Sequence, residues 1–229
     1  MSEPRALPIA ILISGRGSNM LAIARACADG RIHARVSAVI GDRPDAGGLA
    51  RAEALGLATH LVPAGDYPDR TGFEAALQAT LARSGAQLVA LAGFMRILSA
   101  DFVERYAGRM LNIHPSLLPR HPGLHTHRRV LQAGEREHGA SVHFVTRELD
   151  GGPVICQGRL AVYPQDSEQS LSERVQRLEH RIYPRVIGLY SAGRLALRGS
   201  TVLLDGQPLA APLQESEQDD QGRVRADAC

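Results

Sequence analysis

The sequence predicts an α/β protein with a Rossmann-like, mostly parallel twisted sheet flanked by helices, and with an antiparallel C-terminal portion. Two observations lead to this prediction. In the first half, short apolar runs such as residues 7–13 alternate with segments such as residues 20–28, where apolar residues recur at helical spacing. Further on, residues 140–146 alternate between apolar and polar side chains, and residues 154–162 follow a Gly-Gly-Pro turn as their partner strand.

The composition indicates a globular protein with a sizeable core and no specialised charged surface. The 229 residues are enough for one large domain or two small ones, and 44% of them are hydrophobic, which supports a sizeable core. The 26 basic residues nearly balance the 24 acidic ones, so we expect neither a nucleic-acid nor a membrane surface, and no apolar run approaches a membrane span. Residues 1–8 lack the pattern of a signal peptide, and three cysteines without paired spacing argue against disulfides and a cysteine-based zinc site. We therefore expect a cytoplasmic protein.

The order of the elements follows from apolar patterning and from the Gly, Pro and Ser residues at their boundaries. Strands are expected at residues 7–13, 36–40, 58–62, 88–91, 110–113, 140–146 and 154–162. Helices are expected at residues 20–28, 46–55, 71–82 and 128–132, after Ser99, and from Asp166 onward.

The C-terminal part is expected to contain a long helix, a hairpin and a tail. The buried stripe of the helix consists of Leu171, Val175, Leu178 and Ile182. Pro184 is expected to kink or end this helix, and a hairpin of residues 196–204 follows. One domain is expected over residues 1–213, and residues 214–229 are polar enough to form a disordered tail.

The centre of the predicted site is Asn112-Ile113-His114, at the end of a strand that Pro115 terminates. Asn112 and His114 are two residues apart and therefore point to the same side of an extended chain. In an open α/β sheet, ligands bind where strands run out into loops. There an imidazole can transfer a proton near neutral pH, and an amide can stabilise an oxyanion. The alternative is a strand-end histidine that only bonds a neighbouring carbonyl group.

Three further loops contain residues suited to a ligand site. Residues 14–19, Ser-Gly-Arg-Gly-Ser-Asn, connect a strand to a helix as in a phosphate cradle, although a plain tight turn uses the same residues. Residues 92–98 form an unusually apolar loop, which is either a core plug or the wall of a pocket for a flat apolar ligand. Asp150 precedes Gly-Gly-Pro, where it either only forms the turn or holds a carboxylate near an imidazole and favours the charged ring.

Three other signals have stronger alternatives. Glu179 borders the apolar stripe of the last helix, where it either reaches into a cleft or forms a surface ion pair. Arg70 begins a helix, and spacing alone favours a solvated charge. His125 and His127 have the spacing of metal ligands, but no third ligand is placed, so solvated loop histidines are favoured and no metal is expected.

Taken together, four stretches resemble a known family. Residues 14–19, 92–98, 112–119 and 141–153 occur in order and at matching spacing in the phosphoribosylglycinamide formyltransferases, and the chain resembles this family over about residues 7–209. The resemblance implies formyl transfer from the co-substrate 10-formyltetrahydrofolate to the amine of 5'-phosphoribosylglycinamide, in purine biosynthesis. It also implies direct attack through a tetrahedral intermediate, small-molecule substrates only, no metal, and a monomer or homodimer.

The resemblance also assigns roles to individual residues. Its catalytic residues are Asn112, His114 and Asp150. Its ribonucleotide contacts are Gly17, Ser18, Asn19 and Glu179. Its folate contacts are Arg70, Met95, Arg96, Ile97, Leu98, Asn112, Thr146, Arg147, Glu148, Leu149 and Asp150.

Three rival functions remain to be compared with this one. A formyltetrahydrofolate hydrolase of the same superfamily would use water as the nucleophile and carry an additional N-terminal domain. A methionyl-tRNA formyltransferase would need a basic C-terminal domain, whereas residues 215–220 are acidic. A non-catalytic nucleotide-binding module would explain residues 15–19 but not Asn112, His114 and Asp150.

Overall fold

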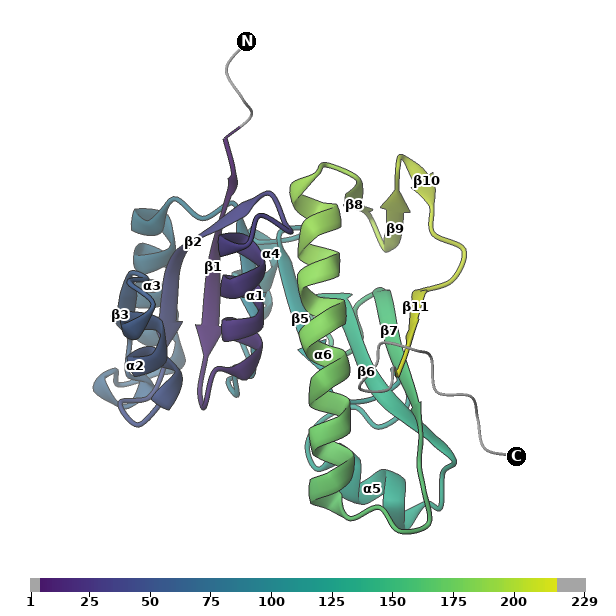
Figure 1. Cartoon of the computed structure of the whole chain (residues 1–229). Helices are drawn as coiled ribbons and strands as arrows, with labels where there is room; N and C mark the ends of the chain where they lie inside the picture. The colour runs from purple at the N-terminus through teal and green to yellow at the C-terminus, as the bar shows by residue number, and fades with distance from the viewer. Residues whose placement is uncertain (1–4, 218–229) are drawn as a thin grey trace.

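The computed structural model describes residues 5–217, which form an eight-stranded sheet, a smaller three-stranded sheet and the helices around them (Figure 1). The helices are α1 (Ser18–Ala28), α2 (Gly47–Ala54), α3 (Arg70–Ser84), α4 (Ala100–Arg105), α5 (Thr126–Gln132) and α6 (Glu168–Ser191), with a short 3₁₀ turn η1 (Ala64–Asp66). The strands of the large sheet are β1 (Leu7–Ile13), β2 (Ala34–Gly41), β3 (Thr59–Leu61), β4 (Leu88–Leu91), β5 (Met110–His114), β6 (Glu137–Phe144), β7 (Val154–Ala161) and β11 (Leu213–Ser216). Those of the small sheet are β8 (Leu195–Arg198), β9 (Thr201–Leu204) and β10 (Gln207–Pro208).

The large sheet has the strand order β11-β7-β6-β5-β4-β1-β2-β3. The pairs between β3 and β5 are parallel, and the pairs β5–β6 and β6–β7 are antiparallel. This arrangement confirms the predicted fold class. The chain adds β2 on one side of β1 and β4 on the other, so the winding direction reverses between β1 and β4. In such sheets a ligand crevice lies at that border, outside the carboxyl ends of the strands.

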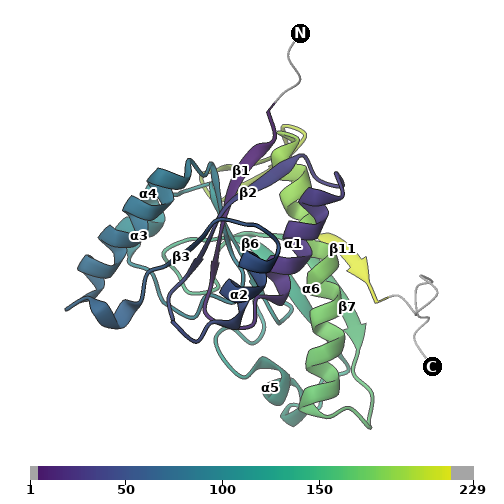
Figure 2. The ribbon, with the colours of Figure 1, turned by 60° about the vertical axis from the view of Figure 1, so that its left-hand side comes forward.

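Helices cover both faces of the large sheet, with α1 and α6 on one face and α3 and α4 on the other (Figure 2). Strand β1 shows why, because its side chains alternate between two apolar cores. Ile9, Ile11 and Ile13 belong to the core that contains α1 and α6. Ala10 and Leu12 belong to the core that contains α3 and α4. A strand buried on both faces is expected to be apolar throughout, as this one is.

Helix α6 continues through Pro184 to Ser191, so the prediction that Pro184 could end the helix is wrong. A capping box at Ser167 starts the helix, and its predicted apolar stripe is buried. Burial continues on both sides of the proline, at Tyr183 and Val186, and the Tyr183 hydroxyl lies 3.0 Å from the carbonyl oxygens of Leu91 and Leu111. This packing holds the helix together despite the missing N–H group. No helix among residues 5–217 is long and apolar enough to cross a membrane.

The C-terminal segment is more ordered than its composition predicts. Strand β11 pairs in parallel with β7, and Glu217 is buried with its carboxylate 2.6 Å from Nη2 of Arg174. Arg181 of α6 pairs with Glu215 in the same way. The prediction of disorder is therefore wrong for residues 214–217, because α6 supplies guanidinium partners for the acidic side chains. The rest of the predicted tail, residues 218–229, lies outside the described residues.

Candidate active site

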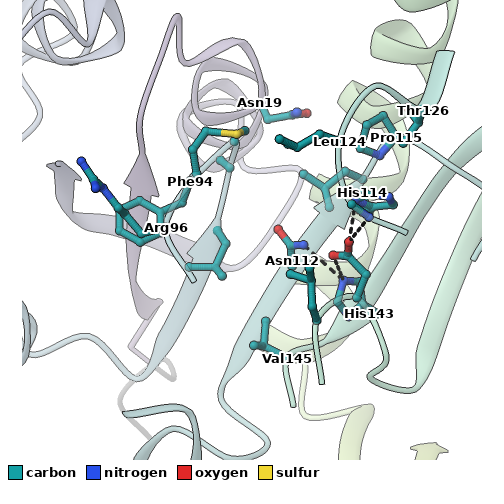
Figure 3. A pocket seen from close by; sticks show the side chains of 18 of the residues that line it. Asn19, Phe94, Arg96, Asn112, His114, Pro115, Leu124, Thr126, His143 and Val145 are labelled. Carbon is teal, nitrogen blue, oxygen red and sulfur yellow. Dashed lines mark hydrogen bonds and ion pairs between the residues drawn. The ribbon is translucent and has the colours of Figure 1, made fainter. Parts of the chain in front are cut away.

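A cavity of about 660 Å³ opens at the carboxyl ends of β1, β4 and β5, beside the border where the winding direction reverses (Figure 3). One side is formed by the loop of residues 15–19 and by Gln176 and Glu179 of α6. The other side is formed by residues 91–98 and 145–150. Asn112 and His114 lie between the two sides, so the predicted site centre is where the sheet topology places a ligand.

The ring of His114 lies between two hydrogen-bond acceptors. Its Nε2 is 3.0 Å from the carbonyl oxygen of His121, and its Nδ1 is 3.4 Å from Oδ2 of Asp150. Each ring nitrogen of His114 therefore faces an oxygen atom, one from the backbone and one from a carboxylate.

Asp150 forms the expected turn, and its carboxylate also lies near the ring of His114. Its φ is 52°, its side chain is only 6% exposed, and its Oδ2 accepts the backbone N–H of Gly123 at 2.8 Å. The turn needs glycine at position 152, because a Cβ there would lie 1.8 Å from the carbonyl oxygen of Phe144. The turn thus directs the carboxylate inward.

Asn112 is oriented by His143, a residue that the sequence analysis placed on a strand without assigning it a role. The two residues are directly opposite each other in the antiparallel pair β5–β6. His143 Nδ1 lies 2.9 Å from the carbonyl oxygen of Phe144 and therefore donates to it. Burial lowers the pKa of His143, although the Phe144 hydrogen bond and Asp150 oppose this, and the lowered pKa favours the neutral ring with Nε2 as an acceptor.

This tautomer determines the orientation of the side-chain amide of Asn112. The Asn112 Nδ2 lies 3.2 Å from His143 Nε2 and donates one N–H to it. The same nitrogen keeps a second N–H, and its position on the cavity wall makes that group available to a ligand oxygen. The cross-strand register that reveals His143 was not assigned from the sequence.

The phosphate-cradle residues lie next to Glu179. Asn19 Nδ2 donates to Oε2 of Glu179 at 2.8 Å, while Asn19 Oδ1 is buried without a hydrogen-bond partner among residues 5–217. Burial raises the pKa of Glu179 to about 7, although the Asn19 hydrogen bond opposes this increase. Gly17 has φ 72° and a Cβ there would lie 2.9 Å from Gly48 Cα, so the tight loop before α1 requires glycine. The predicted ribonucleotide residues therefore form one cluster.

The apolar loop after β4 forms a wall of the cavity, while its Phe94 and Leu98 also pack against the core that contains α3 and α4. Met95 and Ile97 are 64% and 67% exposed, although both line the cavity. The loop is held from behind, because Ser14 Oγ accepts the Met95 N–H at 2.8 Å and Asp42 accepts the Arg96 Nε–H at 2.7 Å. Asp42 is almost fully buried and was not identified from the sequence.

The opposite wall contains the other predicted folate residues, Thr146, Arg147, Glu148 and Leu149. Arg70 is the exception, since it does not line the cavity. Its Nε lies 4.0 Å from Oε1 of Glu74, which in turn accepts the backbone N–H of Ser99 just after the apolar loop.

Two histidines near α5, His127 and His138, contact each other. His127 Nδ1 lies 2.9 Å from Nε2 of His138, and burial lowers the pKa of His138 to about 3. No cluster of three or more His, Cys, Asp or Glu side chains with metal-binding geometry is present among residues 5–217. The expectation that the protein uses no metal stays a prediction.

Comparisons with known proteins identify the family. Residues 7–187 match the formyl transferase family. The chain belongs to the formyl transferase family. It is 51% identical over 201 residues to the phosphoribosylglycinamide formyltransferase of Escherichia coli, covering 88% of this chain and 95% of that protein. A solved structure of the same enzyme from Coxiella burnetii has 50% identity and a TM-score of 0.88, and covers 93% of this chain and all of that one.

A longer relative matches the same region. The trifunctional purine biosynthetic protein of Drosophila melanogaster is 42% identical over 84% of this chain, which corresponds to 14% of its own length. These matches confirm the family, the fold and the enzyme class that the sequence motifs predicted.

Proposed function

We propose that this formyltransferase transfers the formyl group of 10-formyltetrahydrofolate to the amine of 5'-phosphoribosylglycinamide, a step of purine biosynthesis. The observation that carries the proposal is the arrangement of Asn112, His114 and Asp150 between the two halves of one cavity. Each half suits one substrate, and the three side chains suit the oxyanion that forms when an amine attacks a formyl carbon.

The ribonucleotide occupies the side formed by α1 and α6. The backbone N–H groups of Gly17, Ser18 and Asn19 at the N-terminus of α1 bind the phosphate, because they and the helix dipole attract an anion. Glu179 contacts the glycinamide end. A buried carboxylate with few partners of its own is well suited to a substrate amine.

The folate occupies the side formed by the two loops of residues 92–98 and 146–150. Met95, Ile97 and Leu149 supply exposed apolar surface for a flat ring, and backbone groups of both loops supply polar contacts. Arg70 lies outside this cavity, so its folate contact is assigned to a part of the folate that extends past the apolar loop.

The reaction needs one proton transfer and no covalent enzyme intermediate. The substrate nitrogen forms a bond to the formyl carbon, and the carbonyl oxygen becomes an oxyanion that the free N–H of Asn112 and the positive charge of His114 stabilise. Asp150 holds that charge in place. The bond from the carbon to the folate nitrogen then breaks, and the proton lost by the attacking nitrogen reaches the departing one, through water.

The remaining features of the proposal are those expected from the sequence: small-molecule substrates, no metal, a monomer or homodimer, and a cytoplasmic location. The sheet continues to Ser216, so we place one formyltransferase domain over the chain up to that residue.

Spectroscopic detection of tetrahydrofolate release tests the proposal. We expect release only when both 10-formyltetrahydrofolate and 5'-phosphoribosylglycinamide are present. Release with the folate alone would indicate the hydrolase instead. Binding of the ribonucleotide without any folate turnover would indicate the non-catalytic module.

A further inference from the structure

Residues 121–123, between β5 and α5, contact both His114 and Asp150. We call these residues the bridging segment. The carbonyl oxygen of His121 accepts from His114 Nε2 at 3.0 Å. Two residues later, the N–H of Gly123 donates to Oδ2 of Asp150 at 2.8 Å. The segment thus supplies a hydrogen-bond acceptor to the His114 ring and a donor to the Asp150 carboxylate. Its position therefore determines how these two side chains are arranged.

The bridging segment has a backbone conformation that needs support. His121 has φ 50°, in the left-handed region that residues with a Cβ rarely adopt. A change of φ at this residue would rotate its carbonyl group away from His114. Contacts from outside the segment can therefore stabilise this conformation.

Two charged side chains provide this support. Glu135, just after α5, accepts from Nε2 of His121 at 2.6 Å, and both side chains are largely buried, at 24% and 14% exposure. Arg129 of α5 donates from Nη1 to the carbonyl oxygen of Pro122 at 2.6 Å. Neither Glu135 nor Arg129 lines the cavity. Both therefore act on the reacting groups only through the bridging segment.

We propose that Glu135 and Arg129 are positioning residues for formyl transfer, which hold the bridging segment against His114 and Asp150. This inference rests on the proposed function. Loss of the Glu135 contact lets His121 relax towards negative φ, so His114 loses its acceptor and moves relative to the reacting carbon. A small misplacement of a catalytic group has a large effect on rate, so we expect Glu135→Ala to lower kcat about tenfold or more. The KM of the ribonucleotide should stay within about twofold, because the predicted phosphate loop at residues 17–19 belongs to other elements.

Steady-state kinetics of four proteins test the inference: wild type, Glu135→Ala, Glu135→Gln and Arg194→Ala. A glutamine keeps an oxygen that can accept from His121, so Glu135→Gln should recover most of kcat. Arg194 and Asp205 form an exposed ion pair near the small sheet and do not line the cavity, so Arg194→Ala controls for the loss of a charge. Exchange of the His114 Nε2 proton, followed by NMR, should be faster in Glu135→Ala, which reports the geometry independently of turnover.

A second pair of variants decides the matter if Glu135→Ala unfolds. Arg129→Lys keeps a donor for the Pro122 carbonyl oxygen and should retain kcat within about threefold, whereas Arg129→Ala should lower it about tenfold. Glu135→Ala or Arg129→Ala with full kcat overturns the inference. So does a loss of kcat that Glu135→Gln shares, or a loss that appears only as a higher ribonucleotide KM. A wild type without formyl transfer would overturn the proposed function itself.

Discussion

Stability should depend on pH through Glu179, and the glutamine variant isolates this effect. The carboxyl group of Glu179 is buried, and its pKa rises from an ordinary value of 4.5 to about 7 in the folded protein. Between these two values the folded state binds a proton that the unfolded state has released. The contribution of Glu179 to stability is therefore fully present below pH 4.5 and is lost as pH rises through about 7.

The size of the effect follows from the two pKa values. Each pH unit between them corresponds to about 1.4 kcal/mol, so ionisation of Glu179 lowers the free energy of unfolding by at most about 3 kcal/mol above pH 8. Entry of water around the ionised group would reduce this value. The side chain of Glu179→Gln cannot ionise. The glutamine oxygen can accept from Asn19 Nδ2, and the glutamine NH₂ group can donate to Asn19 Oδ1.

Urea unfolding at pH 5, 6, 7 and 8.5 measures the effect. We expect Glu179→Gln to be about as stable as the wild type at pH 5 and about 2–3 kcal/mol more stable at pH 8.5. Glu173→Gln is the matched control, because Glu173 is an exposed glutamate on the same helix. The reasoning is refuted if the difference between wild type and Glu179→Gln is the same at every pH, since Glu179 would then titrate alike in the folded and unfolded states.

Three further predictions concern the reaction. Alanine at Asn112, His114 or Asp150 should lower kcat about a hundredfold or more in steady-state assays while the thermal midpoint changes little, and a variant with near-normal turnover would remove that residue from the mechanism. His143→Leu removes the acceptor that orients Asn112 and should lower kcat about tenfold, whereas His143→Gln should lose less; equal losses would mean that only packing matters. Inorganic phosphate should compete with the ribonucleotide at Gly17–Asn19 in inhibition kinetics. If phosphate competed with the folate instead, the two substrates would be assigned to the wrong sides of the cavity.

The parts of the site that were predictable are those set by local sequence. Apolar runs locate the strands, and a strand end followed by Pro115 or by a glycine loop places side chains at the carboxyl edge of the sheet. The period of two along β5 brings Asn112 and His114 to the cavity without any knowledge of their neighbours. The fold class and the family were predictable for the same reason.

The parts that were missed depend on contacts between distant segments. His143 needs the antiparallel register of β5 and β6, which the sequence alone does not give. Asp42 accepts a hydrogen bond from Arg96, which is 54 residues away in the sequence, and Glu217 accepts one from Arg174, which is 43 residues away. The acidic composition of residues 214–217 indicated disorder because their guanidinium partners lie on another element.

Helix α6 connects both sides of the cavity to the strand that carries Asn112. Near its middle Glu179 accepts from Asn19, which belongs to the first turn of α1. One turn later the Tyr183 hydroxyl contacts the carbonyl oxygens of Leu91 and Leu111, at the end of β4 and within β5. Strand β4 leads into the apolar wall, and β5 carries Asn112 directly after Leu111. Helix α6 therefore fixes the predicted ribonucleotide cluster relative to the predicted folate wall and the predicted catalytic amide of Asn112. The helix also stays packed after Pro184, because Val186 and Ile187 are buried in the same core as the residues before the proline.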